Sequence, residues 1–192
     1  MAGIGHNQGP TLEGGHGWRR HCWSAARAAL LPVLPIEVVR LRVKRAAEIG
    51  LDYRTYASIR AASGHDVIAF LFSSNALHLP LTPGRSGPVV LPPEQVAKLQ
   101  GLRNVGRGLL AQAPLSPADL AGEARVLWDP CTPAPAPLAS WSETRRQLRA
   151  VLAHARWPAG GVVLIGDTTL ERDWVATAQL AHYLPRERFF VA

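Results

Sequence analysis

The stretch that decides the fold is GGVVLIGD at residues 160–167. Its centre is apolar without alternation, which is typical of a strand buried on both faces of a sheet. Amphipathic helical patterns flank it, WSETRRQLRAVLAHARW at 141–157 and TTLERDWVATAQLAHYL at 168–184. RVLW at 125–128 predicts a strand before the first helix, and RFFV at 188–191 predicts one after the second. The order strand, helix, strand, helix, strand predicts a parallel sheet with crossover helices.

Helical patterns fill the N-terminal part of the chain. Residues 18–31 and 35–49 each place apolar side chains together and arginines elsewhere. Asp52 caps a third predicted helix, which ends near residue 62. VIAFLFSSNAL at 67–77 predicts a fourth helix, apolar all round at its start and therefore buried. A proline-rich stretch at 80–93 follows, and residues 93–112 predict a further helix despite three glycines.

We therefore predict an α/β chain in an α+β arrangement. An N-terminal helical unit precedes a small three-stranded, mostly parallel sheet with crossover helices. The expected segments are a flexible leader at 1–17, a basic helical unit at 18–78, a proline-rich crossing and helix at 79–113, and a small α/β unit at 114–192.

Composition favours a folded, basic protein. Apolar residues make up 47% of the 192 residues, and the net charge is +7. Residues 1–60 hold nine Arg and Lys against four Asp and Glu, so +5 of that charge lies there. Such a balance favours polyanionic partners. The sequence shows no signal-peptide pattern and no apolar run of membrane-spanning length, so we expect a cytoplasmic protein that does not contact a membrane.

The strongest nucleic-acid signal is AAEIGLDYRTYASI at 46–59. Ala46, Gly50, Leu51, Tyr56 and Ile59 occupy the small, turn and apolar positions of a helix-turn-helix pattern. In this interpretation the contacts to nucleic acid come from Arg40, Arg42, Lys44, Arg45, Tyr53, Arg54, Ser58 and Arg60. Arg54 would read a guanine edge, and the other cations would bind phosphates. The alternatives are an ordinary helical hairpin that also needs a glycine at its turn, and a protein-binding surface.

The N-terminal stretch GIGHNQGP at 3–10 resembles the GHNxGP start of families of small uncharacterised bacterial proteins, some of them linked to phage-derived genes. Some members also carry an arginine-rich helix followed by Gly-Leu-x-Tyr-x-x-Tyr, which here is Gly50, Leu51, Tyr53 and Tyr56. The resemblance covers the first 60 residues at most. It implies a mobile-element or regulatory protein and brings no activity with it.

Two aspartates follow predicted strands. Asp129 comes after RVLW, and Asp167 comes after GVVLIG. Because the carboxyl ends of parallel strands meet at one edge, we expect the two carboxylates to share it, where they could hold Mg²⁺ or act as an acid–base pair. The alternatives are that Asp167 caps the following helix and that Asp129 belongs to a turn before Pro130. No glycine-rich phosphate loop is present, and we predict neither a metal site nor a cofactor.

Three functions remain open. The first is a nucleic-acid-binding accessory or regulatory protein of mobile-element origin. We expect it to bind DNA rather than RNA and to have a non-enzymatic role. The second is an α/β enzyme or nucleotide-binding module using Asp129 and Asp167. The third is a non-catalytic assembly protein that engages a protein partner through its leader. Each function predicts a different observation. The first predicts nucleic-acid binding that weakens with salt, and the second predicts a pocket that joins the two aspartates. The third predicts a large exposed apolar patch.

Overall fold

The computed structural model describes residues 22, 34–79, 91–119 and 127–190. The chain divides into two compact units, residues 1–39 and 40–192, and the boundary falls inside helix α2 (Ile36–Glu48). Of the first unit, only Cys22 and residues 34–39 are described. The predicted leader, nearly all of the helix expected at 18–31 and the proline-rich residues 80–90 lie outside the described part of the chain.

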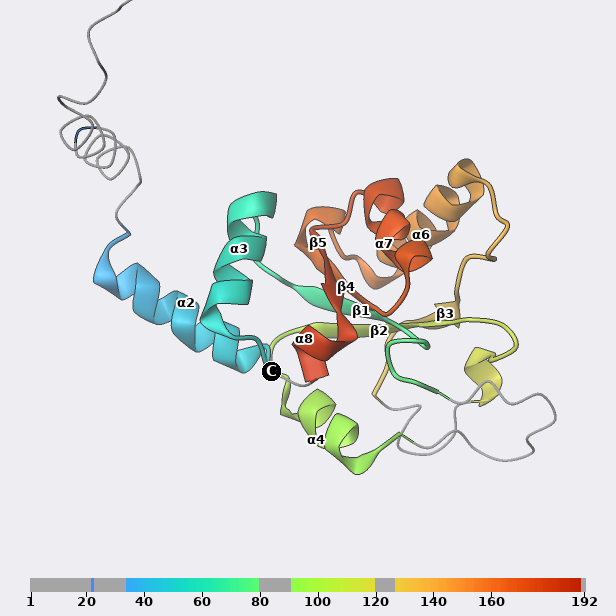
Figure 1. The fold of residues 1–192 in the computed structure, drawn as a ribbon, viewed down its shortest axis with the longest axis horizontal. Helices are drawn as coiled ribbons and strands as arrows, with labels where there is room; N and C mark the ends of the chain where they lie inside the picture. Colours follow the sequence, from blue (N-terminus) through green and yellow to red (C-terminus); the bar gives the residue numbers. More distant parts are fainter. Residues whose placement is uncertain (1–21, 23–33, 80–90, 120–126, 191–192) are drawn as a thin grey trace, which may run out of the picture. The chain divides into compact units, whose positions relative to one another are not determined.

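A parallel sheet of five strands forms the centre of the second unit (Figure 1). The strands are β1 (Ala69–Ser73), β2 (Gly106–Ala111), β3 (Cys131–Pro133), β4 (Val162–Gly166) and β5 (His182–Pro185). Their spatial order is β3-β2-β1-β4-β5, and all four pairings are parallel. The predicted α/β class is confirmed, but the sheet has five strands instead of three.

Helices cover both faces of this sheet. They are α3 (Tyr53–Ser63), α4 (Pro93–Gly101), α6 (Trp141–Ala155), α7 (Thr169–Ala178) and α8 (Arg186–Phe190), with short 3-10 turns at Pro117–Asp119 and Ala159–Gly161. One apolar cluster joins the sheet to α2, α3, α4 and α8, and the other joins it to α6 and α7. Side chains alternate along β1, so Phe70 and Phe72 enter the first cluster and Leu71 enters the second. All three are fully buried, as a central parallel strand requires.

The helix predicted at 67–77 is wrong, because residues 69–73 form β1 at the middle of the sheet. An apolar run without alternation fits a buried helix and a buried strand equally well. Here both faces of the run are covered, which selects the strand. The N-terminal helical unit expected at 18–78 is therefore not confirmed.

The helix predicted at 93–112 is correct only in its first half. α4 ends at Gly101, and β2 follows at Gly106–Ala111. The glycines that weakened the helical pattern belong to the strand: a Cβ on Gly106 would overlap the indole of Trp157, and one on Gly108 would lie 2.9 Å from Leu71 Cδ1. Close packing of Trp157 on β2 explains why these positions lack side chains.

Three elements near the C-terminus also differ from prediction. α7 ends at Ala178, where Gln179 takes a left-handed conformation with φ of 58°, and HYLP then forms β5. RERFF, of which RFF was predicted to be strand, is helix α8. The third strand lies at Cys131–Pro133, beyond Leu127 and Trp128, which are not in a strand. These boundaries come from tertiary packing, which overrides local propensity in short segments.

Candidate functional site

The carboxyl edge of β1 and β4 is the natural place for a ligand in this topology. From β1 the chain proceeds to β2 and β3 on one side, and from β4 it proceeds to β5 on the other. Loops after β1 and β4 therefore leave the sheet in opposite directions, which opens a crevice in open α/β sheets. Residues 74–78 form the turn after β1, and Asp167 follows β4.

His78 and Asp167 meet at this edge. His78 Nε2 lies 3.2 Å from Asp167 Oδ2, and the two side chains are 56% and 31% exposed. The turn that presents the imidazole is closed by a hydrogen bond from the His78 N–H to the Asn75 carbonyl. His78 has a φ of 50°, an uncommon conformation for a residue other than glycine, and such strain clusters at functional sites. The carboxylate orients the ring and leaves Nδ1 for another partner.

A buried carboxylate, that of Glu171, binds the loops at this edge of the sheet. Glu171, in α7, is fully buried. Its Oε1 accepts hydrogen bonds from Asn75 Nδ2 (3.1 Å) and Gln112 Nε2 (2.7 Å), and its Oε2 accepts from the N–H groups of Asp167 (2.7 Å) and Thr168 (2.9 Å). Four donors satisfy the carboxylate, as a buried charge requires. Glu171 therefore holds the loops after β1, β2 and β4 in fixed positions and has no free oxygen for a metal.

Tyr183 packs against the same network from β5. Its hydroxyl donates to the Thr168 carbonyl at 3.3 Å, and burial together with the nearby Glu171 charge raises the pKa of Tyr183 to about 12. A Cβ on Gly166 would lie 2.6 Å from Tyr183 Cε2 and 2.9 Å from Glu171 Oε2. Glycine at the end of β4 therefore allows the tyrosine and the carboxylate to approach the strand closely.

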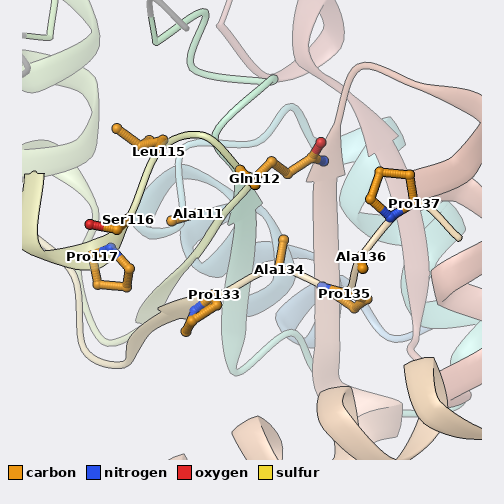
Figure 2. A pocket seen from close by; sticks show the side chains of 11 residues that line it. Ala111, Gln112, Leu115, Ser116, Pro117, Pro133, Ala134, Pro135, Ala136 and Pro137 are labelled. Atoms are coloured by element: carbon orange, nitrogen blue, oxygen red, sulfur yellow. The ribbon is translucent and has the colours of Figure 1, made fainter. Parts of the chain in front are cut away.

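A pocket of about 190 Å³ opens beside this network, at the carboxyl ends of β2 and β3 (Figure 2). Residues 133–137, three of them prolines, form one wall, and residues 115–117 stand across from them. Gln112 lines the pocket and also binds Glu171, so the pocket adjoins the polar network. Its walls are mostly apolar, as in small-molecule sites.

The structure separates the two predicted aspartates. Asp129 precedes β3, and its N–H donates to the carbonyl of Arg107, near the start of β2. It therefore lies at the amino edge of the sheet, while Asp167 lies at the carboxyl edge. The expectation that they share an edge is wrong, because the third strand begins after Asp129 instead of ending before it. The cap of α7 is Thr168, in a capping box with Glu171, and not Asp167.

The predicted helix-turn-helix positions serve the core. Ala46, Leu51, Tyr56 and Ile59 are buried, and Gly50 ends α2 with a φ of 68°. The pattern thus located a real helical hairpin, with Asp52 capping α3 as predicted. Helix pairs of this kind need the same residues whether or not they bind DNA.

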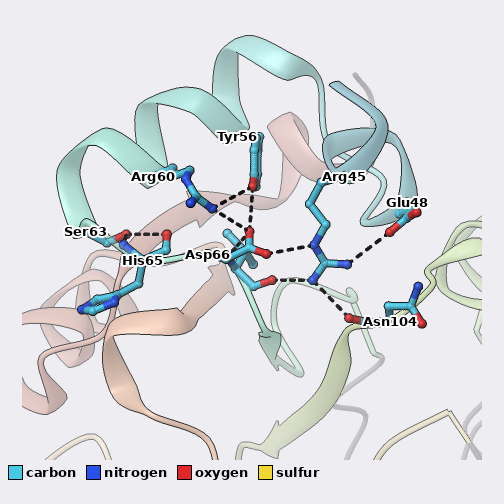
Figure 3. A network of polar contacts seen from close by, with 9 residues as sticks. Arg45, Glu48, Tyr56, Arg60, Ser63, His65, Asp66 and Asn104 are labelled. Carbon is cyan, nitrogen blue, oxygen red and sulfur yellow. Dashed lines mark hydrogen bonds and ion pairs between the residues drawn. The ribbon is translucent and has the colours of Figure 1, made fainter. Parts of the chain in front are cut away.

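Two of the arginines predicted to bind phosphate instead bind groups within the protein (Figure 3). Arg45 donates to the Val67 carbonyl at 2.8 Å, to the Asn104 carbonyl at 3.1 Å and to Asp66 Oδ2 at 3.2 Å. Arg60 forms an ion pair with the same aspartate at 3.6 Å. These arginines fasten the hairpin to the amino ends of β1 and β2.

The remaining predicted contacts are more open. Four cationic side chains of this set make no hydrogen bond or ion pair within the described residues. They are those of Arg40, Arg42, Lys44 and Arg54. Tyr53 packs partly against the core, and Ser58 Oγ donates to the Thr55 carbonyl at 2.8 Å.

Sequence reasoning did not single out Asn75, His78 or Gln112. The two that follow β1 were missed because residues 67–77 were predicted to be helical, so no strand end was recognised there. A usable signal existed at Thr168 and Glu171, whose spacing is that of a capping box directly after a buried strand.

Comparison with known proteins identifies no relative: no family model, curated protein or solved structure matches this chain. Among the described residues, no group of three or more His, Cys, Asp or Glu side chains could hold a metal ion. No helix in the described part of the chain has both the length and the apolar character needed to cross a membrane.

Proposed function

We propose that the chain binds a small polar ligand at the carboxyl edge of β1 and β4 and that His78 accepts a proton there. The observation that carries this proposal is the His78–Asp167 pair, 3.2 Å apart at the switch point of the sheet. Asp167 holds Nε2, so Nδ1 is the nitrogen that takes a proton from a hydroxyl group or a water. This is the enzyme or binding-module hypothesis with Asp167 retained and Asp129 left out.

Two further observations support it. The buried Glu171 network fixes the loops that carry both side chains, which is what a preorganised site requires. The apolar pocket beside Gln112 offers space for a nonpolar part of the ligand.

The test is a binding screen with matched variants. Wild type, His78→Ala and Asp167→Asn are titrated with a panel of nucleosides, nucleotides and small esters, and binding is followed by two-dimensional amide NMR. We expect ligands that shift the amides of residues 74–78 and 167–168, with affinity reduced at least about tenfold in both variants. Asp173→Asn, an exposed position on α7, is the control and should bind as wild type does. Ligands that bind all variants equally, or a panel that never perturbs these amides, would contradict the proposal.

Nucleic-acid binding through the α2–α3 hairpin is a second candidate. What favours it is the group of unpaired cations among the described residues, Arg40, Arg42, Lys44 and Arg54, in a chain of net charge +7. Duplex binding that falls steeply between about 50 and 200 mM salt, and that weakens in Arg40→Ala/Lys44→Ala but not in Arg103→Ala, is the expected result. Salt-independent binding, or equal losses in both variants, would contradict it. A regulatory role, mobile-element origin, a protein partner and a cytoplasmic location stay predictions.

A further inference from the structure

We infer that the exposed surface along the first half of α6 binds single-stranded nucleic acid. This surface is separate from the His78–Asp167 pair and from the α2–α3 hairpin, which packs on the opposite face of the sheet. The surface consists of Leu138, Trp141, Arg145, Arg146 and Arg149 and is called the α6 basic face below.

Helical spacing gathers these side chains. Trp141, Arg145 and Arg149 follow one another at intervals of four residues, so they lie along one side of α6. Leu148 and Val151 point to the sheet and are buried. The α6 basic face thus borders the buried side of the helix, where Leu148 and Leu152 pack, and Arg146 extends it onto the exposed side.

An exposed tryptophan marks this face. Trp141 is 58% exposed and Leu138 is 98% exposed, and within the described residues the other exposed large apolar side chains all belong to α2. Indole rings dominate binding surfaces when they are left in water, because their burial is strongly favourable. The backbone that presents Trp141 is rigid, since Ser140 and Glu143 form a capping box around it.

The face carries a net positive charge. In the part of the chain that the structure describes, Arg145 and Arg146 have no hydrogen bond or ion pair. Arg149 donates to Gln179 Oε1 at 2.6 Å, a neutral group, so its positive charge persists. Glu143, which accepts hydrogen bonds from Ser140 in the cap, keeps its charge and offsets one of the three positive charges through Arg146. The face is still net positive, so an anionic partner is favoured.

Single-stranded nucleic acid is the anion that fits best. Residues four apart on a helix are separated by about 6 Å along the axis, close to the phosphate spacing of an extended strand. A single strand also exposes base faces that can stack on Trp141, whereas a duplex hides them. Arginine forks match phosphate oxygens. An anionic membrane would need a wider apolar surface than Leu138 and Trp141 provide.

The pocket at the carboxyl ends of β2 and β3 lies next to Leu138 in the chain. Residues 133–137 line it, and the chain passes from Pro137 directly to Leu138. Gln147 Nε2, on α6, donates to the Pro133 carbonyl at 3.0 Å and fixes this wall to the helix.

The experiment measures binding of labelled oligo-dT and oligo-rU, about 12 nucleotides long, and of a duplex of equal length. Wild type is compared with Trp141→Ala, Arg145→Ala/Arg149→Ala and the control Arg103→Ala, an exposed position outside both proposed surfaces. We expect single strands to bind more tightly than the duplex, with Kd raised about tenfold or more by Trp141→Ala. Arg145→Ala/Arg149→Ala should also reduce the salt dependence. Oligo-dT should quench a fluorescence component that Trp141→Phe lacks.

Three results would overturn the inference. One is no binding of either single strand at low salt. Another is single-strand binding that the α6 variants leave unchanged, or that Arg103→Ala lowers as much as they do. The third is binding to vesicles that contain anionic phospholipid without binding to oligo-dT, which would assign the face to membranes. Unfolding of each variant in urea separates lost binding from lost fold. We expect stabilities within about 1 kcal/mol of wild type, because Trp141 and Arg145 are exposed and Arg149 is half-buried with one hydrogen bond to a neutral group.

Discussion

The carboxylate of Glu171, in α7, accepts a 2.7 Å hydrogen bond from the side-chain amide of Gln112, which follows β2, 59 positions away in the chain. The same amide group's oxygen accepts from Asn75, at the end of β1, at 3.0 Å. Three side chains thus connect the ends of strands that are far apart in the sequence. We expect this network to stabilise the fold and to position the candidate site.

Substitution Glu171→Gln should cost about 3 kcal/mol of unfolding free energy, because the new amide would point donors at donors and leave buried groups unpaired. Urea unfolding measures this loss. Glu143→Gln is the matched control: it occupies the same capping-box position in α6 but is exposed, and we expect a clearly smaller loss. Equal losses at the two positions would show that the Glu171 network adds nothing beyond a helix cap.

Substitution Gly106→Ala should destabilise the fold by about 2 kcal/mol, since the added methyl group overlaps the indole of Trp157. The effect is checked by thermal and urea unfolding. Gly101→Ala, at the end of α4, meets no atom within 4 Å and should be neutral or stabilising by up to about 1 kcal/mol. A double variant that also carries Trp157→Ala should lose less than the sum of its single changes; additive losses would argue against this contact.

Substitution Arg45→Ala should cost about 2–3 kcal/mol, because it removes donors to Asp66 and to two backbone carbonyls. Arg40→Ala, on the exposed side of α2, should change stability by less than about 0.5 kcal/mol. Denaturant unfolding of both variants distinguishes the structural arginine from the free one. A neutral Arg45→Ala would return this side chain to the candidates for phosphate binding.

Stability should fall on acidification in part because of His182. Burial, and secondarily the charge of Arg188, holds the pKa of His182 below its ordinary value of 6.5. As pH falls through 6.5, the unfolded chain gains a proton at this residue before the folded chain does, so folding loses free energy. Unfolding at about pH 7.5 and about pH 5 should therefore differ less in His182→Gln than in wild type. His154→Gln, exposed on α6, controls for loss of an imidazole; an unchanged pH dependence in His182→Gln would contradict the assignment.

Strongly periodic or punctuated segments were predictable from the sequence. The hairpin at α2 and α3, with its turn at Gly50 and cap at Asp52, followed from local chemistry that acts within a few residues. α6 followed from clear periodicity, and β4 followed from a short apolar run between two helical patterns. β1 did not, because an unbroken apolar run does not say which neighbours will cover it. The site depended on two strand boundaries. Because the end of β1 was not recognised, His78 was not placed at an edge of the sheet. Because the third strand was expected before Asp129 and lies after it, Asp129 was assigned to the wrong edge.

The outermost strands of the sheet have a consequence for how copies of this chain meet one another. β3 and β5 are only three and four residues long, and each finishes at a proline, Pro133 and Pro185. Proline lacks the N–H that an incoming strand would need, and a short border offers few sites for pairing. Both edge strands therefore disfavour pairing with a strand of another copy. A concentrated solution of the folded chain should resist forming fibrils that grow from the native sheet.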